Sequence, residues 1–286
     1  MQPSGTTRLT CLLGSPVSHS ISPAMHNTAF EALGLDYSYM AFDISESQIK
    51  NAIDALKLLN CRGFNLTMPL KTAIIPYLDE LSEAARLSHS VNTCVFEDGK
   101  LIGHTTDGIG FMEAMTDSGI SYKNKVITIL GAGGAATSII VQAALDGVSK
   151  INIFKRKNAT FDKIVDFADK ITRSTDCDVF VFDMADATTL EFCLQESDIL
   201  INGTNVGMGD DDSSLVPVEF LRKELIVTDV IYHPAYTRLL KDAKSLGCKV
   251  MNGKYMLLYQ GAAAFKLWTG QDMPIDLIKE KCFTED

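Results

Sequence analysis

Hydrophobic residues follow two different patterns along this 286-residue chain, one before Val126 and one after it. From Val126 onward, short runs of mainly apolar residues alternate with segments of helical periodicity. A short apolar run without regular polar alternation is typical of a parallel strand that is covered on both faces. The pattern predicts strands at 126–130, 151–154, 179–182, 199–202 and 226–230, and helices at 134–145, 160–172 and 188–194. Such strand–helix repetition predicts a doubly wound parallel sheet.

The first hundred residues mix strand and helix patterns less regularly. Strands are expected at 10–13, at 37–42, from 63, at 91–95 and from 101, with helices after Ser22, at 45–59 and at 84–90. Ser22 is placed to cap the first helix and Pro23 to occupy its first position, and Asp98-Gly99 predicts a hairpin turn. An apolar helix is expected at 256–268, and one more helix at 274–282. The length suits two domains, so we predict an α/β protein with a Rossmann-type doubly wound parallel sheet domain and a second α/β domain.

A glycine-rich turn joins the strand at 126–130 to the helix at 134–145. Gly131, Gly133 and Ala136 have the spacing G-x-G-x-x-A. The first glycine permits a tight turn, the second lets a pyrophosphate approach the backbone, and the small third residue lets the helix pack closely on the strand. The helix start adds free N–H groups and the positive end of a dipole. In this context the motif predicts a dinucleotide site, and the alternative is a glycine turn without a ligand.

The loop after the second of these later strands bears on which dinucleotide binds. An acidic residue there usually holds the adenosine ribose of NAD, but this loop reads Lys155-Arg156-Lys157-Asn158. Three cations favour the 2′-phosphate of NADP, whereas Asn158 leaves a ribose contact, and therefore NAD, open. A basic surface turn is the third interpretation. Glycine and hydroxyl residues after the strand at 199–202, Thr204 among them, suit the cofactor crevice at the carboxyl ends of the strands.

Four polar features elsewhere are candidates for substrate chemistry. Ser18 and Ser20 alternate in a hydroxyl-rich loop, and this spacing would point both hydroxyls toward a small anion such as a carboxylate. Lys71 opens a helix, where a cation is electrostatically misplaced, which suggests a site amine as well as the simpler surface lysine. Asp107 is either a site carboxylate or the N-cap of a helix at 110–115. Gln260 is a lone amide on an apolar helix, which by itself is typical of a satisfied core group.

Composition excludes several classes of function. The net charge of -10 argues against nucleic acid and anionic membranes as partners, because phosphate binding needs a basic face. The seven cysteines show no C-x-x-C or metal-ligand spacing, so we expect no metal site and a reducing, cytoplasmic compartment. The apolar run at the start of the chain is too short for a signal peptide or a membrane span.

Taken in order, these motifs resemble the shikimate dehydrogenase family, and within it the quinate/shikimate dehydrogenase branch. The resemblance covers about residues 10–280. It depends on seven motifs together: Ser18-x-Ser20-x-Ser22-Pro23, Asn65-Leu66-Thr67-x-Pro69-x-Lys71, Val91-Asn92-Thr93, Thr106-Asp107-Gly108, Gly131-Ala132-Gly133-Gly134-Ala135, Asn202-x-Thr204 and Gly253-x-x-Met256-Leu257-x-x-Gln260-Gly261.

The resemblance implies a role for each matching position. Lys71 and Asp107 would form the catalytic pair. The substrate carboxylate would be held by Ser18, Ser20 and Tyr232, and its ring hydroxyls by Asn65, Thr67, Asn92, Asp107 and Gln260. The pyrophosphate would be bound by Gly131, Ala132, Gly133, Gly134 and Ala135, and the adenosine ribose by Lys155, Arg156, Lys157 and Asn158. Thr204 would lie in the cofactor crevice, and Val230 and Gly253 near the nicotinamide.

The resemblance also implies the domain plan and the reaction. A substrate-binding and catalytic domain at 1–110 would be completed by C-terminal helices at 254–286, with an NAD(P)-binding Rossmann domain at 111–253 between them. We expect an NAD(P)-dependent dehydrogenase that interconverts shikimate and 3-dehydroshikimate, as a possible homodimer. Thr105 stands where the family often has Asn, and the loop at 155–157 is Lys-Arg-Lys where the family usually has Asn-Arg-Thr. These departures leave open whether quinate is also a substrate and whether the cofactor is NAD or NADP. A side chain near Thr67, Thr106 or Tyr232 would decide between shikimate and quinate.

Two other functions compete with this one. The first is a non-catalytic regulatory protein that binds a dinucleotide and a hydroxy acid, for which loss of Lys71 or Asp107 would be the expected mark. Both residues are present. The second is another two-domain dehydrogenase, such as a methylenetetrahydrofolate enzyme, whose pterin pocket fits the Ser18/Ser20 loop poorly.

Overall fold

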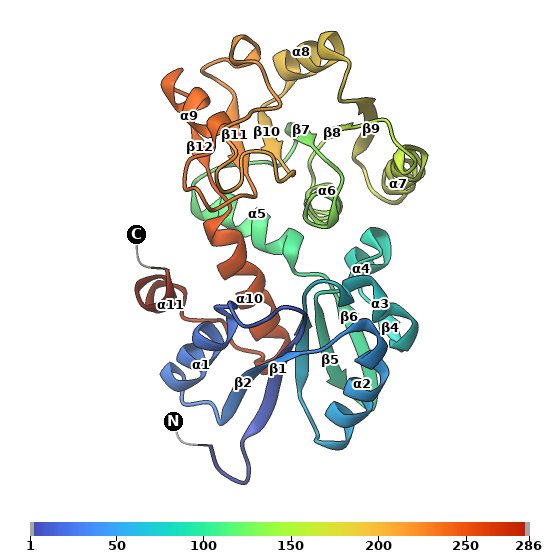
Figure 1. Ribbon diagram of the computed structural model, residues 1–286, viewed down its shortest axis with the longest axis vertical. Helices are drawn as coiled ribbons and strands as arrows, with labels where there is room; N and C mark the ends of the chain where they lie inside the picture. Colours follow the sequence, from blue (N-terminus) through green and yellow to red (C-terminus); the bar gives the residue numbers. More distant parts are fainter. Residues whose placement is uncertain (1–2, 284–286) are drawn as a thin grey trace. The chain divides into compact units, whose positions relative to one another are not determined.

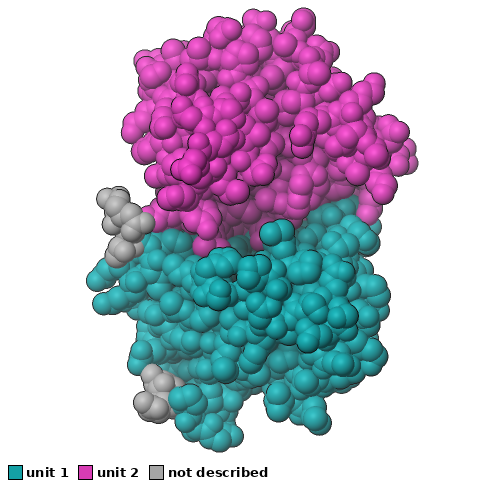
Figure 2. Space-filling model, in the orientation of Figure 1, with its two compact units in different colours: residues 1–106, 258–286 teal, residues 107–257 magenta. Residues whose placement is uncertain are grey.

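The computed structural model describes residues 3–283 of the chain. It divides into two compact units, one of residues 1–106 with 258–286 and one of residues 107–257, which Figure 2 distinguishes by colour. The expected division placed the boundaries at 110/111 and 253/254, whereas the units change over after Thr106 and after Leu257. The first unit is therefore discontinuous in sequence.

The first unit is built on a mixed six-stranded sheet (Figure 1). Its order is β2-β1-β3-β5-β6-β4, in which β2, β1 and β3 are parallel and β5 is antiparallel to both of its neighbours. The strands are β1 (Arg8–Gly14), β2 (Tyr37–Asp43), β3 (Gly63–Leu66), β4 (Glu80–Leu81), β5 (Thr93–Glu97) and β6 (Lys100–His104). The helices are α1 (Ser22–Ala32), α2 (Ile49–Leu58), α3 (Leu70–Ala73), α4 (Glu83–Ser88), α10 (Lys254–Thr269) and α11 (Ile275–Cys282), with short 3-10 turns at Glu46–Gln48 and Ile75–Tyr77.

Two apolar layers cover this sheet. One is the packing of α2 against β1, β3 and β5, with Ile53, Leu13 and Phe64 in its centre. The other is an aromatic layer, in which α1 and α10 contribute His26 and Trp268. Trp268 donates a hydrogen bond from Nε1 to the Cys94 carbonyl of β5 at 3.0 Å. The C-terminal helix α10 is thus part of the core of the first unit.

The second unit is a six-stranded sheet in which every pairing is parallel. Its order is β12-β11-β10-β7-β8-β9. Renumbered from its first strand this is 6-5-4-1-2-3, the order of a dinucleotide-binding Rossmann fold. The strands are β7 (Val126–Leu130), β8 (Lys150–Lys155), β9 (Asp178–Asp183), β10 (Ile199–Asn202), β11 (Ile226–Asp229) and β12 (Val250–Met251). The helices are α5 (Asp107–Asp117), α6 (Gly134–Leu145), α7 (Phe161–Ser174), α8 (Ala187–Glu196) and α9 (Arg238–Ser245), with a 3-10 turn at Val218–Phe220.

The hydrophobic pattern locates most of these elements. The expected ranges of β7, α6 and β10 coincide with the observed ones, and positive φ angles at Asp98 (49°) and Gly99 (78°) confirm the hairpin turn between β5 and β6. The burial of β7 and β10 explains this success, because both strands are mainly apolar, with Thr128 and Asn202 as their only polar residues.

Three local predictions are wrong. Ser22 is the first residue of α1 and not its cap; the N-cap is Ile21, without a side-chain hydrogen bond. The strand expected at 91–95 lies at Thr93–Glu97, because the chain turns at 89–92 before it enters the sheet. The helix α9 was not predicted, although its apolar residues keep helical spacing, and the strands β4 and β12 were missed because two residues carry no periodic signal.

Candidate active site

A buried network of amides and hydroxyls lies in the first unit where β3 and β6 end and β5 begins. Asn65 of β3 donates from Nδ2 to the Thr93 hydroxyl at 2.9 Å and to the Asn92 carbonyl at 3.1 Å. Its Oδ1 accepts a hydrogen bond from the Tyr39 hydroxyl at 2.8 Å. Both N–H groups of the Asn65 amide are therefore engaged, and its orientation is fixed by its neighbours.

Asn92 forms the centre of this network. Its Oδ1 accepts from the Thr106 backbone N–H at 2.7 Å and from the Thr93 hydroxyl at 3.1 Å. Its Nδ2 donates to the Thr106 hydroxyl at 3.0 Å and to Gln260 Oε1 at 3.4 Å. The structure thus brings together Asn65, Asn92 and Gln260, three residues predicted to bind substrate hydroxyls. It adds three that were not among the predicted site residues: Tyr39, Thr93 and Thr106.

Burial explains why these additional residues escaped prediction. Tyr39 alternates like any strand residue, and hydroxyls such as those of Thr93 and Thr106 are common in strands. Thr93 and Thr106 are completely buried and Tyr39 is 2% exposed, so their polar atoms need partners. Burial also raises the pKa of Tyr39 well above its usual value, although the Ser22 side chain opposes this through a hydrogen bond. Only the tertiary contacts show that these hydroxyls hydrogen bond to the side-chain amides of Asn65 and Asn92.

Lys71 lies in α3, a helix of a single turn. Its carbonyl accepts a hydrogen bond from Val91 N–H at 2.8 Å, which fixes its backbone next to the segment that carries Asn92. The sequence argument that a cation is misplaced at a helix start does not apply here. A helix of four residues has no first turn distinct from its last, and its dipole is correspondingly small.

Asp107 is the first residue of α5 and is 8% exposed. The alternative prediction, an N-cap before a helix at 110–115, is wrong in its position, because the helix begins at Asp107 itself. Asp107 follows Thr106 directly in the chain, and the Thr106 backbone is held by Asn92. The network therefore fixes the residue that precedes this carboxylate.

The loop of Ser18 and Ser20 is folded into a turn. Ser20 N–H donates to the Val17 carbonyl at 3.1 Å, and Ser20 Oγ accepts from Ser22 N–H at 3.2 Å. The two serines therefore do not lie on an extended strand, and the orientation of their hydroxyls toward a shared anion stays a prediction. Thr67 lies against the start of this loop: a Cβ added to Gly14 would approach Thr67 Cγ2 to 2.3 Å.

The glycine motif of the second unit lies at the switch point of the parallel sheet. β7 is flanked by β10 and β8, so the chain order reverses beside β7. Gly131 has a φ of +93°, and a Cβ there would meet Thr204 Cγ2 at 2.7 Å. The loops after β7 and β10 therefore approach each other closely, as expected of a crevice outside the carboxyl ends of the strands.

The start of α6 has backbone donors available. Its N-cap is Gly133, which has no side chain to bind the free N–H groups of the first turn, and Gly133 and Gly134 are exposed. Ala136 is completely buried and contacts the loop after β10, since a Cβ at Gly203 would meet Ala136 Cβ at 2.8 Å. These features fit the pyrophosphate of a dinucleotide.

The basic loop after β8 keeps two cations available. Lys155 donates to Asn158 Oδ1 at 2.8 Å, and the same oxygen accepts from Thr160 N–H at 3.1 Å. Arg156 and Lys157 are exposed. Asn158 therefore acts within the loop as an acceptor for its neighbours, and its amide nitrogen remains the group able to reach a ribose hydroxyl.

The loops after β10 and β11 carry the remaining predicted positions. Thr204 donates to Asn202 Oδ1 at 2.7 Å. A Cβ at Gly253 would meet the Val230 carbonyl oxygen at 2.0 Å, so the two predicted nicotinamide neighbours are in direct contact. Tyr232 follows β11 and is 58% exposed.

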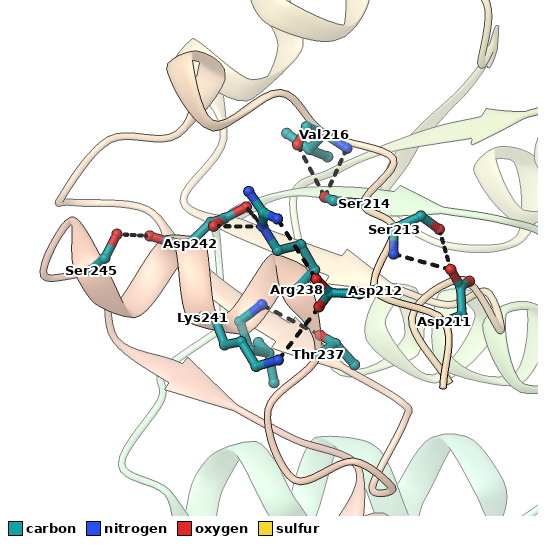
Figure 3. Close-up of polar contacts among 11 residues, drawn as sticks. Asp211, Asp212, Ser213, Ser214, Val216, Thr237, Arg238, Lys241, Asp242 and Ser245 are labelled. Carbon is teal, nitrogen blue, oxygen red and sulfur yellow. Dashed lines mark hydrogen bonds and ion pairs between the residues drawn. The ribbon is translucent and has the colours of Figure 1, made fainter. Parts of the chain in front are cut away.

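The acidic segment at 209–213 forms ion pairs with α9, as Figure 3 shows. Asp211 accepts from Gly207 N–H at 2.9 Å, and Asp212 pairs with Arg238 at 3.8 Å and Lys241 at 3.5 Å. The carboxylates of this segment thus restrain the loop through protein partners.

Together these features define a class of protein. The second unit has a parallel sheet of Rossmann order, with a glycine turn and an uncapped helix start at its switch point. The first unit has a buried network of amides and hydroxyls. This combination is typical of a two-domain, dinucleotide-dependent oxidoreductase. Residues 12–94 match the shikimate dehydrogenase substrate binding domain and residues 255–283 the shikimate 5′-dehydrogenase C-terminal domain. The chain belongs to the shikimate dehydrogenase family.

Individual relatives agree with this assignment. A shikimate dehydrogenase (NADP(+)) of Listeria monocytogenes is 47% identical over 98% of this chain and 97% of its own length, and that of Streptococcus uberis is 46% identical over 99% and 97%. The crystal structure of the Listeria monocytogenes enzyme with shikimate and NAD has a TM-score of 0.95, with 47% identity and 98% of both chains covered. A quinate dehydrogenase of Corynebacterium glutamicum in complex with NAD has a TM-score of 0.85, with 31% identity over 96% of this chain and 98% of that one.

The comparisons confirm the predicted family, the α/β fold with a Rossmann-type sheet, and the enzyme class. They favour the dehydrogenase over the regulatory protein that was its alternative. Within residues 3–283, the helices are all too short or too polar to cross a membrane.

Proposed function

We propose that this protein is an NADP- or NAD-dependent dehydrogenase that interconverts shikimate and 3-dehydroshikimate. The observation that carries the proposal is the buried network of Asn65, Asn92 and Gln260, because amides fixed in this way discriminate a polyhydroxylated ring from an apolar one. Its relatives named for shikimate support the choice of substrate. The first unit would bind the substrate and the second the dinucleotide.

The proposed substrate contacts are those that the family resemblance implies. Both N–H groups of Asn65 are engaged, so its remaining acceptor capacity at Oδ1 would receive a ring hydroxyl. Thr67, Asn92, Asp107 and Gln260 would complete the hydroxyl contacts. Ser18, Ser20 and Tyr232 would bind the carboxylate. Hydroxyl donors suit this task, because a carboxylate accepts several hydrogen bonds.

The reaction requires the loss of a proton and a hydride from one alcohol. The nicotinamide supplies the hydride acceptor when the dinucleotide is bound. Lys71 would remove the hydroxyl proton during oxidation and return it during reduction, while Asp107 accepts a hydrogen bond from the same hydroxyl. General acid–base catalysis depends on orientation. Two hydrogen bonds support these roles: Val91 N–H donates to the Lys71 carbonyl, and the N–H of Thr106, the residue before Asp107, donates to Asn92.

Substitution of Lys71 tests the mechanism. Lys71→Ala should lower turnover by roughly 10²–10⁴, the usual worth of a general base, with the KM for shikimate changed little. Lys57→Ala, at an exposed position on α2, is the matched control and should keep parental turnover. Turnover of Lys71→Ala near that of the parent would remove the lysine from the reaction.

The loop at 155–158 supports NADP as the preferred dinucleotide, with NAD as the alternative. Exposed Arg156 and Lys157 are placed to bind a 2′-phosphate, and the relatives named above include NADP(+) enzymes. Quinate is a second candidate substrate, favoured by the structural likeness to a quinate dehydrogenase. Initial rates with both acids and both dinucleotides decide among the four pairs.

The setting of the enzyme is also a proposal. All seven cysteines are free, which supports a reducing compartment, the cytoplasm. A homodimer is carried over from the family resemblance. Light scattering of the purified protein measures the assembly directly.

A further inference from the structure

One buried carboxylate lies between the loops that follow β10 and β11. Asp229 is the last residue of β11 and is completely buried. Asn202, the last residue of β10, is its register partner across the sheet and is 3% exposed. Both side chains therefore lie at the carboxyl edge of the sheet, the edge at which the glycine turn after β7 also lies.

The two oxygens of Asp229 hold different segments. Oδ1 accepts from Ile231 N–H at 2.9 Å, which fixes the turn that carries Val230 and Tyr232. Oδ2 accepts from Asn202 Nδ2 at 3.1 Å and from the Thr237 hydroxyl at 2.8 Å. Thr237 caps α9, so the carboxylate also joins the start of that helix to the two strand ends.

Asn202 extends this arrangement into the loop of Thr204. Its Oδ1 accepts from Thr204 N–H at 3.1 Å and from the Thr204 hydroxyl at 2.7 Å, and its Nδ2 also donates to the Val206 carbonyl at 3.1 Å. Thr204 is the residue whose methyl group a Cβ at Gly131 would meet. The amide thus connects Asp229 to the crevice beside the glycine turn.

The backbone of Val230 is held on both sides. Val230 N–H donates to the Asn202 carbonyl at 3.0 Å, and Gly253 N–H donates to the Ile231 carbonyl at 2.9 Å. A Cβ at Gly253 would meet the Val230 carbonyl oxygen at 2.0 Å, so the two segments are in close contact. Asp229 accepts from Ile231 N–H and Asn202 from Val230 N–H, so these two residues supply hydrogen bonds that hold the turn.

The free-energy cost of burying the Asp229 carboxylate indicates that this side chain has a role beyond filling the core. Burial of a charge is unfavourable unless hydrogen bonds compensate it, and here burial raises the pKa of Asp229 to about 6 although Ile231, Asn202 and Thr237 donate to it. An apolar residue at the end of a buried strand would be the cheaper solution for the fold alone.

We propose that Asp229 is a positioning residue that, through Asn202, sets the Thr204 loop and the Val230 turn relative to each other and so orients the nicotinamide half of the dinucleotide. The inference builds on the proposed function, since it assumes that a nicotinamide dinucleotide binds at this edge. Under the proposed function the adenosine and pyrophosphate would be bound at residues 131–135 and 155–158, and none of the three residues that donate hydrogen bonds to Asp229 is among these. Loss of the carboxylate should therefore affect the two halves unequally.

The test compares Asp229→Asn with the parent in two binding measurements. ADP, which contains only the adenosine and pyrophosphate, should bind with its affinity unchanged within about twofold. NADP(+) or NAD(+), whichever the parent binds more tightly, should bind about tenfold more weakly, a difference of about 1.4 kcal/mol. The reason is that an amide presents N–H groups to the Asn202 and Thr237 donors. With shikimate, kcat should fall at least as much as the dinucleotide affinity.

An exchange of the two side chains provides the rescue. In the double variant Asn202→Asp with Asp229→Asn, an amide at 229 donates to a carboxylate at 202, which still accepts from Thr204 but no longer donates to the Val206 carbonyl. Part of the lost dinucleotide affinity should return. Asn202→Ala cuts the same connection without touching the carboxylate, and it should show the same split if Asp229→Asn fails to fold.

Equal losses for ADP and dinucleotide would overturn the proposal, because a merely structural defect would weaken both. Parental affinity and kcat in Asp229→Asn, or a double variant no better than the single one, would overturn it too. The affinities for ADP and for the dinucleotide are both measured without catalysis. A parent that binds dinucleotide but does not oxidise shikimate would refute the proposed substrate and leave the role of Asp229 testable.

Discussion

At the scale of single residues, some buried polar groups of this protein have hydrogen-bond partners and, within residues 3–283, one buried histidine does not. Asn65 and Asn92 have partners for their amides, and Asp229 has three donors. His26 is completely buried, and neither ring nitrogen has a hydrogen-bond partner among the described residues. Its ring instead stacks on Tyr39, with centroids 4.4 Å apart and planes 13° apart. Its neutral ring thus serves as an aromatic group.

This burial predicts a pH-dependent stability. Desolvation lowers the pKa of His26 from 6.5 to about 3. Between these values the unfolded chain binds a proton that the folded chain does not, so this contribution to stability is full above about pH 6.5 and declines as the pH falls toward 3. Between pH 7.5 and pH 5, His26 should cost the protein about 2 kcal/mol, since each unit of pKa shift corresponds to about 1.4 kcal/mol.

Urea unfolding of His26→Phe at both pH values measures this contribution. The aromatic replacement keeps the stacking partner of Tyr39, so the variant should lose about 2 kcal/mol less than the parent between pH 7.5 and pH 5. His89→Asn is the control, because His89 is exposed and has a positive φ of 51° that asparagine tolerates. The same pH dependence in parent and His26→Phe would show that His26 is not responsible.

At the scale of elements, the docking of α10 on β3 completes the first unit. Arg62 donates from Nε to the Trp268 carbonyl at 2.9 Å, so a cation caps the C-terminal end of α10. Gly63, the first residue of β3, lies under the Trp268 ring. A Cβ there would approach Trp268 Nε1 to 2.3 Å and the Cys94 carbonyl oxygen to 2.4 Å. The absence of a side chain at 63 is therefore what admits the indole.

Gly63→Ala should destabilise the protein by about 2–3 kcal/mol, because overpacking forces the ring or the strand to move. Gly5→Ala is the matched control, since a Cβ at Gly5 meets nothing within 4 Å. Thermal and urea unfolding of both variants give the comparison. A stability of Gly63→Ala equal to that of Gly5→Ala would mean that the indole is not confined as described.

At the scale of the whole molecule, the chain leaves the first unit at Thr106 and returns to it at Leu258. Thr106 and Gln260 both hydrogen bond to Asn92, so these two points of the chain lie close together within the unit. The segment between them forms a parallel sheet whose strands are all its own. The second unit is therefore an insertion between two parts of the first.

This arrangement predicts how fragments fold. Residues 107–257 alone should unfold cooperatively, and residues 1–106 alone should not, because they lack Phe265 and Trp268 of α10. A chain of residues 1–106 joined by a short Gly/Ser linker to 258–286 should regain a cooperative transition, since the ends to be joined are close. Circular dichroism during urea titration measures all three. A cooperative transition of residues 1–106 equal to that of the joined chain would contradict the role given to α10.

The sequence was most informative where local patterns and burial agree. β7, the glycine turn and α6 were predictable because a buried parallel strand, a tight turn and a helix each leave a strong local mark. The motif positions Asn65, Asn92 and Gln260 were predictable from the resemblance. Tyr39 and Asp229 were not, because a strand tyrosine or a strand-end aspartate has the same local pattern whether or not it orients a neighbour.

The chain by itself thus determined the fold class, the glycine turn and the family, all of which depend on short-range periodicity and on motifs read in order. Only the tertiary structure decided which hydroxyls orient the amides, that the Ser18–Ser20 segment is a turn, and that Asp229 joins two loops. These facts depend on contacts between residues far apart in the chain. Asn202 and Asp229 are neighbours because two parallel strands end together, and no local pattern records that register.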